Sequence, residues 1–354
     1  MRLQKIASLF LCAAILHSFA FAFETDQYNL PIEPLADTGA EVSRYAEENL
    51  REAVEKINAE IAARQNCLDK IVEKPQLIKC GAPEIERGKL AALRSEDAVV
   101  RAVFNRLGAG FPPFTESGSW MESHEFAAQP ARYKTGIGKS IFNSSPANYL
   151  TISSTVNLYG AQFGTDKIAH VFQQGFSYYR IYKRALARGE TAEAATKRAV
   201  NWGKSTEKTY YGTLISGVYS NADLCANFIG LKFYQNLTRD IKIGGETKPA
   251  ILILKNGVWT FGENADARGE NILEPFVSNH LNEARNPSLF LPVLRSNVRR
   301  AVKKYGCKLW RTRFPDQSKT DYENETHSLM LWHGEDYGFK RSEKFVTIAN
   351  TCFG

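Results

Sequence analysis

Apolar residues recur at helical spacing in the N-terminal part of the chain. Over residues 37–66, apolar positions lie three and four residues apart, from Val42 through Leu50 to Ile61, and Glu, Lys and Arg fill the other positions. This pattern predicts an amphipathic helix. Residues 84–107 predict a second one. We expect the two helices to form a scaffold or cap, the alternative being a helical arm that binds a partner.

The helical pattern breaks over residues 108–129. Several glycines and the pair Pro112-Pro113 predict a long loop, which carries Trp120, Met121 and His124. Long loops often form lids or substrate walls. Because most single surface histidines carry no chemistry, His124 is not among the candidate site residues.

Three further helices are predicted over residues 166–188, 191–208 and 221–237. Ile168, Phe172 and Phe176 supply an apolar face to the first, and Thr191 is placed to cap the second. No run approaches about 20 apolar residues, so we expect no helix to cross a membrane. Helices of this kind can still lie against a membrane surface.

The pattern changes after residue 246. Two short apolar runs flank Asn256-Gly257, a dipeptide typical of two-residue β-hairpin turns. Helix-like stretches follow at 272–284 and 288–305, and residues 326–352 suggest a further strand pair. The predicted fold is mainly α, a helical bundle core with a smaller C-terminal α+β region. The predicted regions are a signal peptide (1–22), an N-terminal helical region (23–110), a helical core (111–245) and the C-terminal region (246–354).

The first 22 residues resemble a secretory leader. Arg2 and Lys5 precede an apolar run, and Ala20-Phe21-Ala22 offers small residues in the arrangement that signal peptidase recognises. The alternative is a bacterial lipoprotein anchored through Cys12. Cleavage after Ala22 lowers the formal charge from +7 over 354 residues to +5 over 332. We therefore expect a periplasmic or secreted protein, with association with a membrane surface as a further possibility.

This charge suits an anionic envelope surface or simple solubility, and nothing in the sequence indicates a nucleic-acid partner. The composition, 44% hydrophobic and 23% charged, excludes a disordered chain and a small disulfide scaffold. The length is enough for about two domains with real cores.

Five cysteines follow the leader. Cys67 and Cys80 are plausible disulfide partners in an oxidising compartment, as are Cys307 and Cys352. Cys225 lies in an apolar run and is expected to be a buried free thiol. A zinc site made of thiols is the alternative, but the chain has no Cys-x-x-Cys pair.

Polar residues recur inside the otherwise apolar central helices. Asp166 and His170 are four residues apart and share a helical face, which Gln174 continues. Glu207 lies on the next helix, and Asp223 and Asn227 are four apart on the third. If the side chains converge, Asp166, His170, Glu207 and Asp223 could bind a divalent metal or act as acid and base, with Asn227 orienting them.

Each of these residues also has a structural interpretation. Asp166 could complement a helix dipole, with Thr165 as the cap. Ser220 and Asp223 fit a capping box. His170 and Asn227 could simply be satisfied by hydrogen bonds in the core. Buried ionisable groups need partners, however, and these residues are natural partners for one another. A polar network that only fixes helix packing remains an alternative.

Read in order, these residues resemble a known signature. The order D-K-x-x-H, a helical Glu, then S-x-x-D-x-x-x-N-x-x-G is similar to that of VanZ-like proteins and of the related YfiM-like envelope proteins. The members here are Asp166, Lys167, His170, Glu207, Ser220, Asp223, Asn227 and Gly230. The similarity covers about residues 160–235.

The chain departs from that signature in two respects. VanZ-like proteins are embedded in the membrane, whereas these helices are polar. Gly217-Val218-Tyr219 occupies the stretch in which those proteins usually carry an arginine. The resemblance implies a compact helical core and a cell-envelope setting, and supplies no substrate.

Two functions follow as hypotheses. In the first, an exported envelope protein uses its polar core to organise helix packing, and its flanking regions bind a partner or a lipid surface. In the second, a metal- or acid/base-dependent hydrolase acts on an envelope component through Asp166, His170, Glu207 and Asp223. The second predicts that these four side chains converge within a few ångströms beside an accessible cavity.

Overall fold

The computed structural model describes residues 24–73, 80–111, 114–209, 211–262 and 271–354. The fold is mainly α, as predicted, with small antiparallel strand pairs among the helices. The predicted leader lies outside the described residues.

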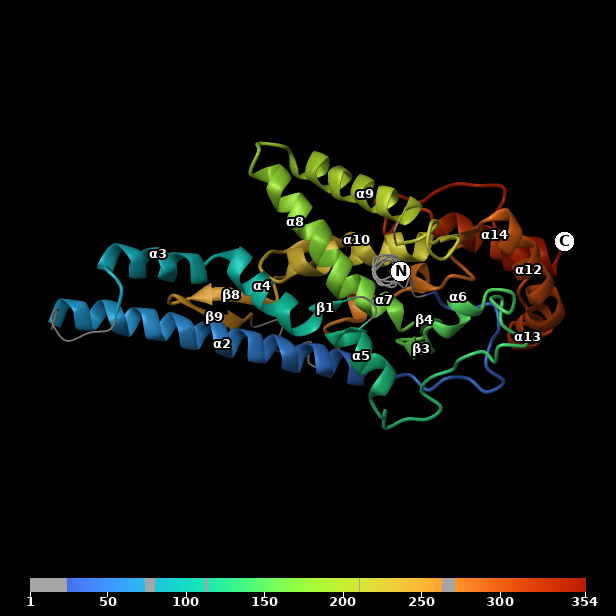
Figure 1. Cartoon of the computed structure of the whole chain (residues 1–354), viewed down its shortest axis with the longest axis horizontal. Helices are drawn as coiled ribbons and strands as arrows, with labels where there is room; N and C mark the ends of the chain where they lie inside the picture. The colour runs from blue at the N-terminus through green and yellow to red at the C-terminus, as the bar shows by residue number, and fades with distance from the viewer. Residues whose placement is uncertain (1–23, 74–79, 112–113, 210, 263–270) are drawn as a thin grey trace, which may run out of the picture.

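A long arm is formed by the N-terminal helices, as Figure 1 shows at the blue end of the chain. Helix α2 (Gly39–Glu73) confirms the first predicted helix and extends it by about two turns. The second predicted helix is instead two helices, α3 (Pro83–Leu93) and α4 (Glu96–Leu107). The division falls at Ser95, whose side chain accepts a hydrogen bond from the Ala98 N–H and caps α4.

The predicted hairpin lies along this arm. Strands β8 (Leu252–Lys255) and β9 (Val258–Phe261) pair through a turn in which Asn256 and Gly257 both have positive φ. Such a turn matches the twist of the two strands. The hairpin packs against α2, where the Asn58 side chain hydrogen-bonds the backbone of Trp259.

The segment expected to be a long loop contains regular structure. Strands β1 (Gly110–Phe111) and β2 (Phe114–Thr115) lead into α5 (Glu116–Ser123). The Thr115 side chain caps this helix by accepting a hydrogen bond from the Gly118 N–H. The loop prediction is therefore wrong for these residues. The glycines and prolines favoured a loop, but Thr115 caps a helix within the segment.

The central helices follow the hairpin of β3 (Thr155–Leu158) and β4 (Ala161–Gly164). One nearly continuous helical rod contains α7 (Asp166–Ala169), the π-helical turn η1 (His170–Gln174) and α8 (Gly175–Leu186). Helix α9 (Ala192–Lys208) returns beside α8, and α10 (Asn221–Asn236) crosses the core. All three predicted helices are confirmed.

The C-terminal region is more helical than predicted. Only a single β-bridge, between Trp332 and Glu335, forms within residues 326–352, and the segment ends in helix α15 (Ile348–Cys352). The strand pair predicted there is wrong. The stretch 272–284 contains two 3-10 turns rather than a full helix. The remaining elements are α6 (Pro146–Leu150), β5 (Val218–Tyr219), β6 (Ile241–Ile243), β7 (Glu246–Lys248), η3 (Glu274–Phe276), η4 (Asn279–Leu281), β10 (Leu289–Phe290), α12 (Pro292–Ala301), η5 (Val302–Gly306), α13 (Cys307–Arg313) and α14 (Lys319–Ser328).

Both predicted disulfides are present. Cys67 pairs with Cys80 near the end of the arm, and Cys307 pairs with Cys352 in the C-terminal region. Cys225 is a buried free thiol on α10, also as predicted. Within the described ranges, every helix is too short or too polar to cross a bilayer.

Candidate functional site

The site forms where the β3–β4 hairpin ends and two helices begin. Asp166 and Lys167 occupy the first turn of α7, directly after β4. Asp223 occupies the first turn of α10, whose N-cap is Ser220. Positive partial charge at the start of a helix favours carboxylates there. The two aspartates are therefore placed by the same local rule on two different helices.

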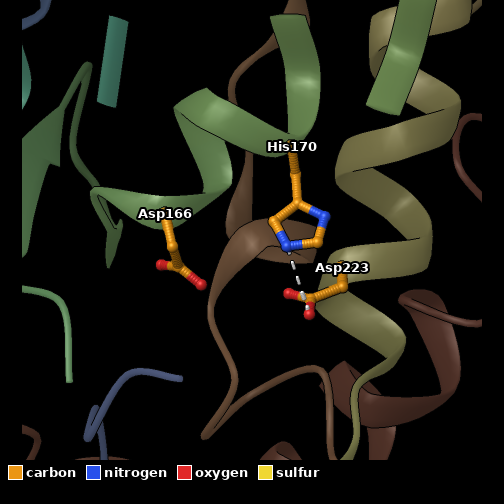
Figure 2. Close-up of side chains that lie close together, drawn as sticks. All are labelled: Asp166, His170 and Asp223. Carbon is orange, nitrogen blue, oxygen red and sulfur yellow. Dashed lines mark ion pairs between the residues drawn. The ribbon is translucent and has the colours of Figure 1, made fainter. Parts of the chain in front are cut away.

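Asp166, His170 and Asp223 converge, as Figure 2 shows. Each offers one ligand atom, and these atoms lie within 4.8 Å of one another. Both carboxylates are buried, whereas the His170 side chain is 16% exposed. Solvent therefore reaches this group of three at the imidazole.

Lys167 lies at the centre of the carboxylates. Its Nζ is 2.6 Å from Asp166 Oδ2, 2.5 Å from Asp223 Oδ1 and 2.5 Å from Glu283 Oε1. Burial lowers the pKa of Lys167, but the three carboxylates outweigh it and hold the pKa well above its usual value. Burial likewise raises the pKa of Asp166, and Lys167 and His170 reverse this, so that its pKa is lowered overall. Lys167 is therefore an ammonium ion within the protein interior.

The imidazole of His170 is fixed in one orientation. Its Nδ1 lies 2.9 Å from Asn227 Oδ1, and because an amide oxygen only accepts, Nδ1 carries the hydrogen. Nε2 lies 3.5 Å from Asp223 Oδ2 (dashed line in Figure 2). In the neutral ring, Nε2 then carries a lone pair, and this lone pair faces a carboxylate oxygen of Asp223. Two acceptors at this separation need a proton or a cation between them.

His170 also begins the π-helical turn η1. Turns of this type are frequent at functional sites, because the extra residue changes the direction of the side chains that follow. Here the Phe172 carbonyl of the turn accepts a hydrogen bond from Tyr234 of α10, at 2.7 Å. This bond ties the turn to the helix that carries Asp223 and Asn227.

Glu207 belongs to the cluster of buried acidic residues around Lys167, but not to the group of three formed by Asp166, His170 and Asp223. It comes from the last turn of α9, and its Oε1 accepts a hydrogen bond of 2.8 Å from the Ser220 N–H. Burial and the nearby Asp223 raise the pKa of Glu207 well above its usual value. Of the four predicted metal ligands, the structure thus brings three together, with one ligand atom of each within 4.8 Å of the others, and places the fourth beside them as a buried acid.

Glu24 and Glu283 are two acidic residues of the cluster that the sequence analysis missed. Glu283 is buried and pairs with Lys167, and burial raises its pKa to about 8. Glu24 is 1% exposed, and its pKa is raised by burial and then by Glu283 and Asp223. Neither has a helical spacing to another site residue. The one available signal was the acidic residue two positions after the predicted cleavage site.

The alternative structural roles are met only in part. Ser220 caps α10 by accepting a hydrogen bond from the Asp223 N–H, at 3.1 Å. The Asp223 carboxylate does not complete a capping box, because it pairs with Lys167 instead. Thr165 does not cap α7, and its hydroxyl donates to Glu122. Capping therefore accounts for Ser220 but not for the carboxylates.

No protein-family model, curated protein or solved structure matches this chain. The VanZ-like resemblance accordingly stays a prediction.

Proposed function

We propose that this protein is an exported hydrolase of the cell envelope whose centre is a divalent metal ion held by Asp166, His170 and Asp223. The observation that carries the proposal is the 3.5 Å separation between His170 Nε2 and Asp223 Oδ2. Zinc ligands lie about 2.0–2.2 Å from the ion, which places two of them about 3.4 Å apart in tetrahedral geometry. The bond from His170 Nδ1 to Asn227 also matches the way in which metal-binding histidines are held.

The donor set indicates the class of ion. One imidazole and two carboxylates suit Zn²⁺ or Mn²⁺ better than Cu⁺, which prefers thiolates and thioethers. Such an ion supplies a Lewis acid and lowers the pKa of a bound water toward neutrality. Glu207, whose pKa is raised well above its usual value by burial and by Asp223, is the proposed proton donor to a leaving group.

A network that only fixes packing explains the cluster less well. Such a network is stable when all its polar atoms are paired. Among the described residues, Glu24 Oε2 and Gln27 Nε2 are buried without a hydrogen-bond partner. Five buried carboxyl groups, moreover, surround one ammonium group. An excess of this kind costs stability, which favours a functional reason for keeping it.

The proposed location rests on sequence and on the disulfides. Two disulfides are typical of proteins outside the reducing cytoplasm. The predicted leader supplies a route of export.

The first test measures metal binding by the protein that begins at Phe23. Elemental analysis after purification without chelators, and Zn²⁺ and Mn²⁺ titration calorimetry, should give one ion per chain. Asp223→Asn should weaken binding at least a hundredfold, because it removes a charged ligand. His124→Ala is the matched control, since His124 also pairs with a carboxylate, Glu41 at 2.7 Å, but outside the cluster.

The second test measures hydrolysis of chromogenic phosphate, acetyl ester and anilide substrates with the metal-loaded protein. At least one should be turned over, and His170→Ala should abolish turnover while His124→Ala does not. A wild-type protein that folds normally but binds neither ion would overturn the proposal and favour the packing network. So would turnover that survives both Asp223→Asn and His170→Ala.

A further inference from the structure

One stretch of the C-terminal region carries a high density of positive charge. Residues 291–313 contain eight Lys and Arg residues and no Asp or Glu. They form α12, the π-helical turn η5 and α13, which follow one another at the end of the molecule opposite the arm (Figure 1). No acidic residue within the stretch offsets its charge.

The cations of this stretch lie on its outer side. Its inner side is apolar, and Val298 and Val302 have no exposed surface. We call the outer side the basic face, and it consists of five exposed residues: Arg299, Arg300, Lys303, Lys304 and Lys308. Within the described residues, none of these five forms an ion pair with a carboxylate. Because like charges four residues apart repel one another, as in Arg300 and Lys304, the basic face favours an anionic partner.

Exposed apolar residues adjoin the start of the basic face. Leu291 and Val293, at the beginning of α12, are 41% and 74% exposed, and Leu214 and Ile215, in the loop before β5, are 73% and 40% exposed. The two segments are joined, because the Leu291 N–H donates to the Gly217 carbonyl at 2.8 Å. We call these four exposed residues the apolar patch. Exposed apolar side chains that gather in one place indicate an interaction surface.

The apolar patch and the basic face share one side of α12. Val293 and Arg300 are seven residues apart on this helix, which is about two turns. Their side chains therefore leave the helix in the same direction. A flat partner that contacts Arg300 also contacts Val293.

A lipid surface with anionic headgroups matches both features. Lys and Arg are attracted to such headgroups, and apolar side chains beside them enter the boundary between headgroups and acyl chains. A nucleic acid would use the cations through its phosphates but would leave the exposed leucines and valine in water. A second copy of this chain would bring two basic faces together, and these repel.

We propose that the basic face and the apolar patch form one surface that docks on a membrane containing anionic lipid. The cations would bind headgroup phosphates, and the apolar patch would enter the boundary beneath them. The loop that carries Leu214 also contacts the acidic cluster around Lys167, because the Thr213 N–H donates to the Glu207 carbonyl at 2.9 Å. Docking would therefore hold the cluster close to the lipid surface. Binding of this kind does not require the proposed hydrolase activity.

The first test measures binding of the protein that begins at Phe23 to lipid vesicles, by sedimentation in EDTA. Vesicles of phosphatidylglycerol and phosphatidylcholine in equal parts should bind it at least tenfold more tightly than vesicles of phosphatidylcholine alone. Raising the ionic strength should weaken this binding, because salt screens the attraction between cations and headgroups. Equal binding to both kinds of vesicle, or binding to neither, would overturn the proposal.

Charge reversal tests the basic face. Arg300→Glu combined with Lys304→Glu should lower the affinity for the anionic vesicles at least tenfold. Arg180→Glu combined with Arg184→Glu is the matched control, because these two arginines are also exposed and four residues apart, but on α8. The control changes the net charge equally and should lower the affinity less than threefold. Equal losses in the two variants would overturn the proposal, because net charge alone would then govern binding.

Serine substitutions test the apolar patch. Leu214→Ser combined with Val293→Ser should lower the affinity for the anionic vesicles at least tenfold, because two apolar side chains no longer leave water. Ile85→Ser combined with Leu254→Ser is the matched control, since these residues are 54% and 43% exposed on the arm. It should change the affinity less than twofold.

Two other outcomes would replace the membrane with a different partner. Vesicle binding that survives the serine substitutions, together with tight binding of an RNA oligonucleotide, would indicate a nucleic-acid surface. A dimer in analytical ultracentrifugation that the substitutions dissociate would indicate a second copy of the chain. All of these measurements are made in EDTA and without turnover, so their failure is distinct from a failure of the metal site.

Discussion

At the scale of single residues, one ammonium group organises the site. Lys167 contacts three carboxylates within 2.6 Å and has no exposed surface. Burying an ion pair seldom stabilises a protein more than apolar residues of the same volume would, whereas removing one partner of such a pair costs about 3–5 kcal/mol. Stability alone therefore gives no reason for this arrangement. The proposed metal site gives one, because a cation bound at His170 needs carboxylate ligands beside it.

Asp26, another buried acid, gives a prediction about pH. Asp26 accepts hydrogen bonds from Asn29 and from the Ile141 N–H, but burial dominates and raises its pKa to about 6, against about 3.8 in the unfolded chain. Between these values the folded chain holds a proton that the unfolded chain has lost. The Asp26 contribution to stability is therefore complete below pH 3.8 and is lost as the pH rises to about 6.

The expected loss from Asp26 is about 3 kcal/mol in the free energy of unfolding. Urea unfolding of the wild type and of Asp26→Asn from pH 3.5 to 7 measures it as the difference between the two curves. Asp321→Asn, an exposed residue at the start of α14, serves as the control and should leave the loss in place. Parallel curves for the wild type and Asp26→Asn would contradict the prediction.

The residues of the site were predictable only where they follow helical spacing. Asp166 with His170, and Asp223 with Asn227, are each four apart, so one turn of helix brings each pair to one face. Glu24 and Glu283 come from irregular segments far away in sequence. Only the tertiary fold brings them to Lys167, and no periodicity carries that information.

At the scale of elements, the contact between α10 and the π-helical turn sets the geometry of the site. Gly230 of α10 faces the Val171 carbonyl and Gly175, and a Cβ atom at Gly230 would overlap both. The two backbones are therefore in direct contact, one turn from Asn227. This approach holds His170 opposite Asp223.

Gly230→Ala should separate the two elements. Overpacking of this kind costs about 1–3 kcal/mol, and the widened gap between His170 and Asp223 should weaken Zn²⁺ binding as well. Gly88→Ala is the matched control, because nothing lies within 4 Å of a Cβ atom at this exposed position of α3. It should stabilise the helix by about 0.5–1 kcal/mol. Urea unfolding and Zn²⁺ calorimetry measure both effects, and equal behaviour of the two variants would contradict this account.

Most helices were predictable because an apolar face repeats along them, and the errors occur where capping residues outweigh that pattern. Ser95 divides the second predicted helix, and Thr115 starts α5 within a segment read as a loop. Near the C-terminus, Thr347 forms a capping box with Asn350 and begins α15, where strands were expected. At these three places, a short polar side chain that hydrogen-bonds the nearby backbone starts a helix that hydrophobic spacing did not predict.

At the scale of the whole molecule, two buried clusters of apolar residues adjoin the site. The larger one includes residues of the arm and the central helices, and the smaller one joins Tyr28 to the C-terminal helices. Tyr28 donates to the Val346 carbonyl at 2.7 Å, and its own carbonyl accepts from Trp310 at 2.9 Å. The segment 24–27 is continuous with Tyr28. The C-terminal region therefore anchors the segment 24–27, which enters the polar cluster around Lys167.

The two disulfides should consequently differ in their effect on the site. Cys307–Cys352 belongs to the cluster that holds Tyr28, and its loop of 45 residues predicts a loss of about 4 kcal/mol when both cysteines become serine. Hydrogen exchange should then accelerate at peptides covering residues 24–30 and 139–142. Replacing Cys67 and Cys80 is the matched control, with about 3 kcal/mol predicted from its shorter loop. Because that loop lies in the arm, exchange in this control should rise only at the end of α2. Faster exchange at residues 24–30 in the control would show that the C-terminal apolar cluster does not anchor these residues.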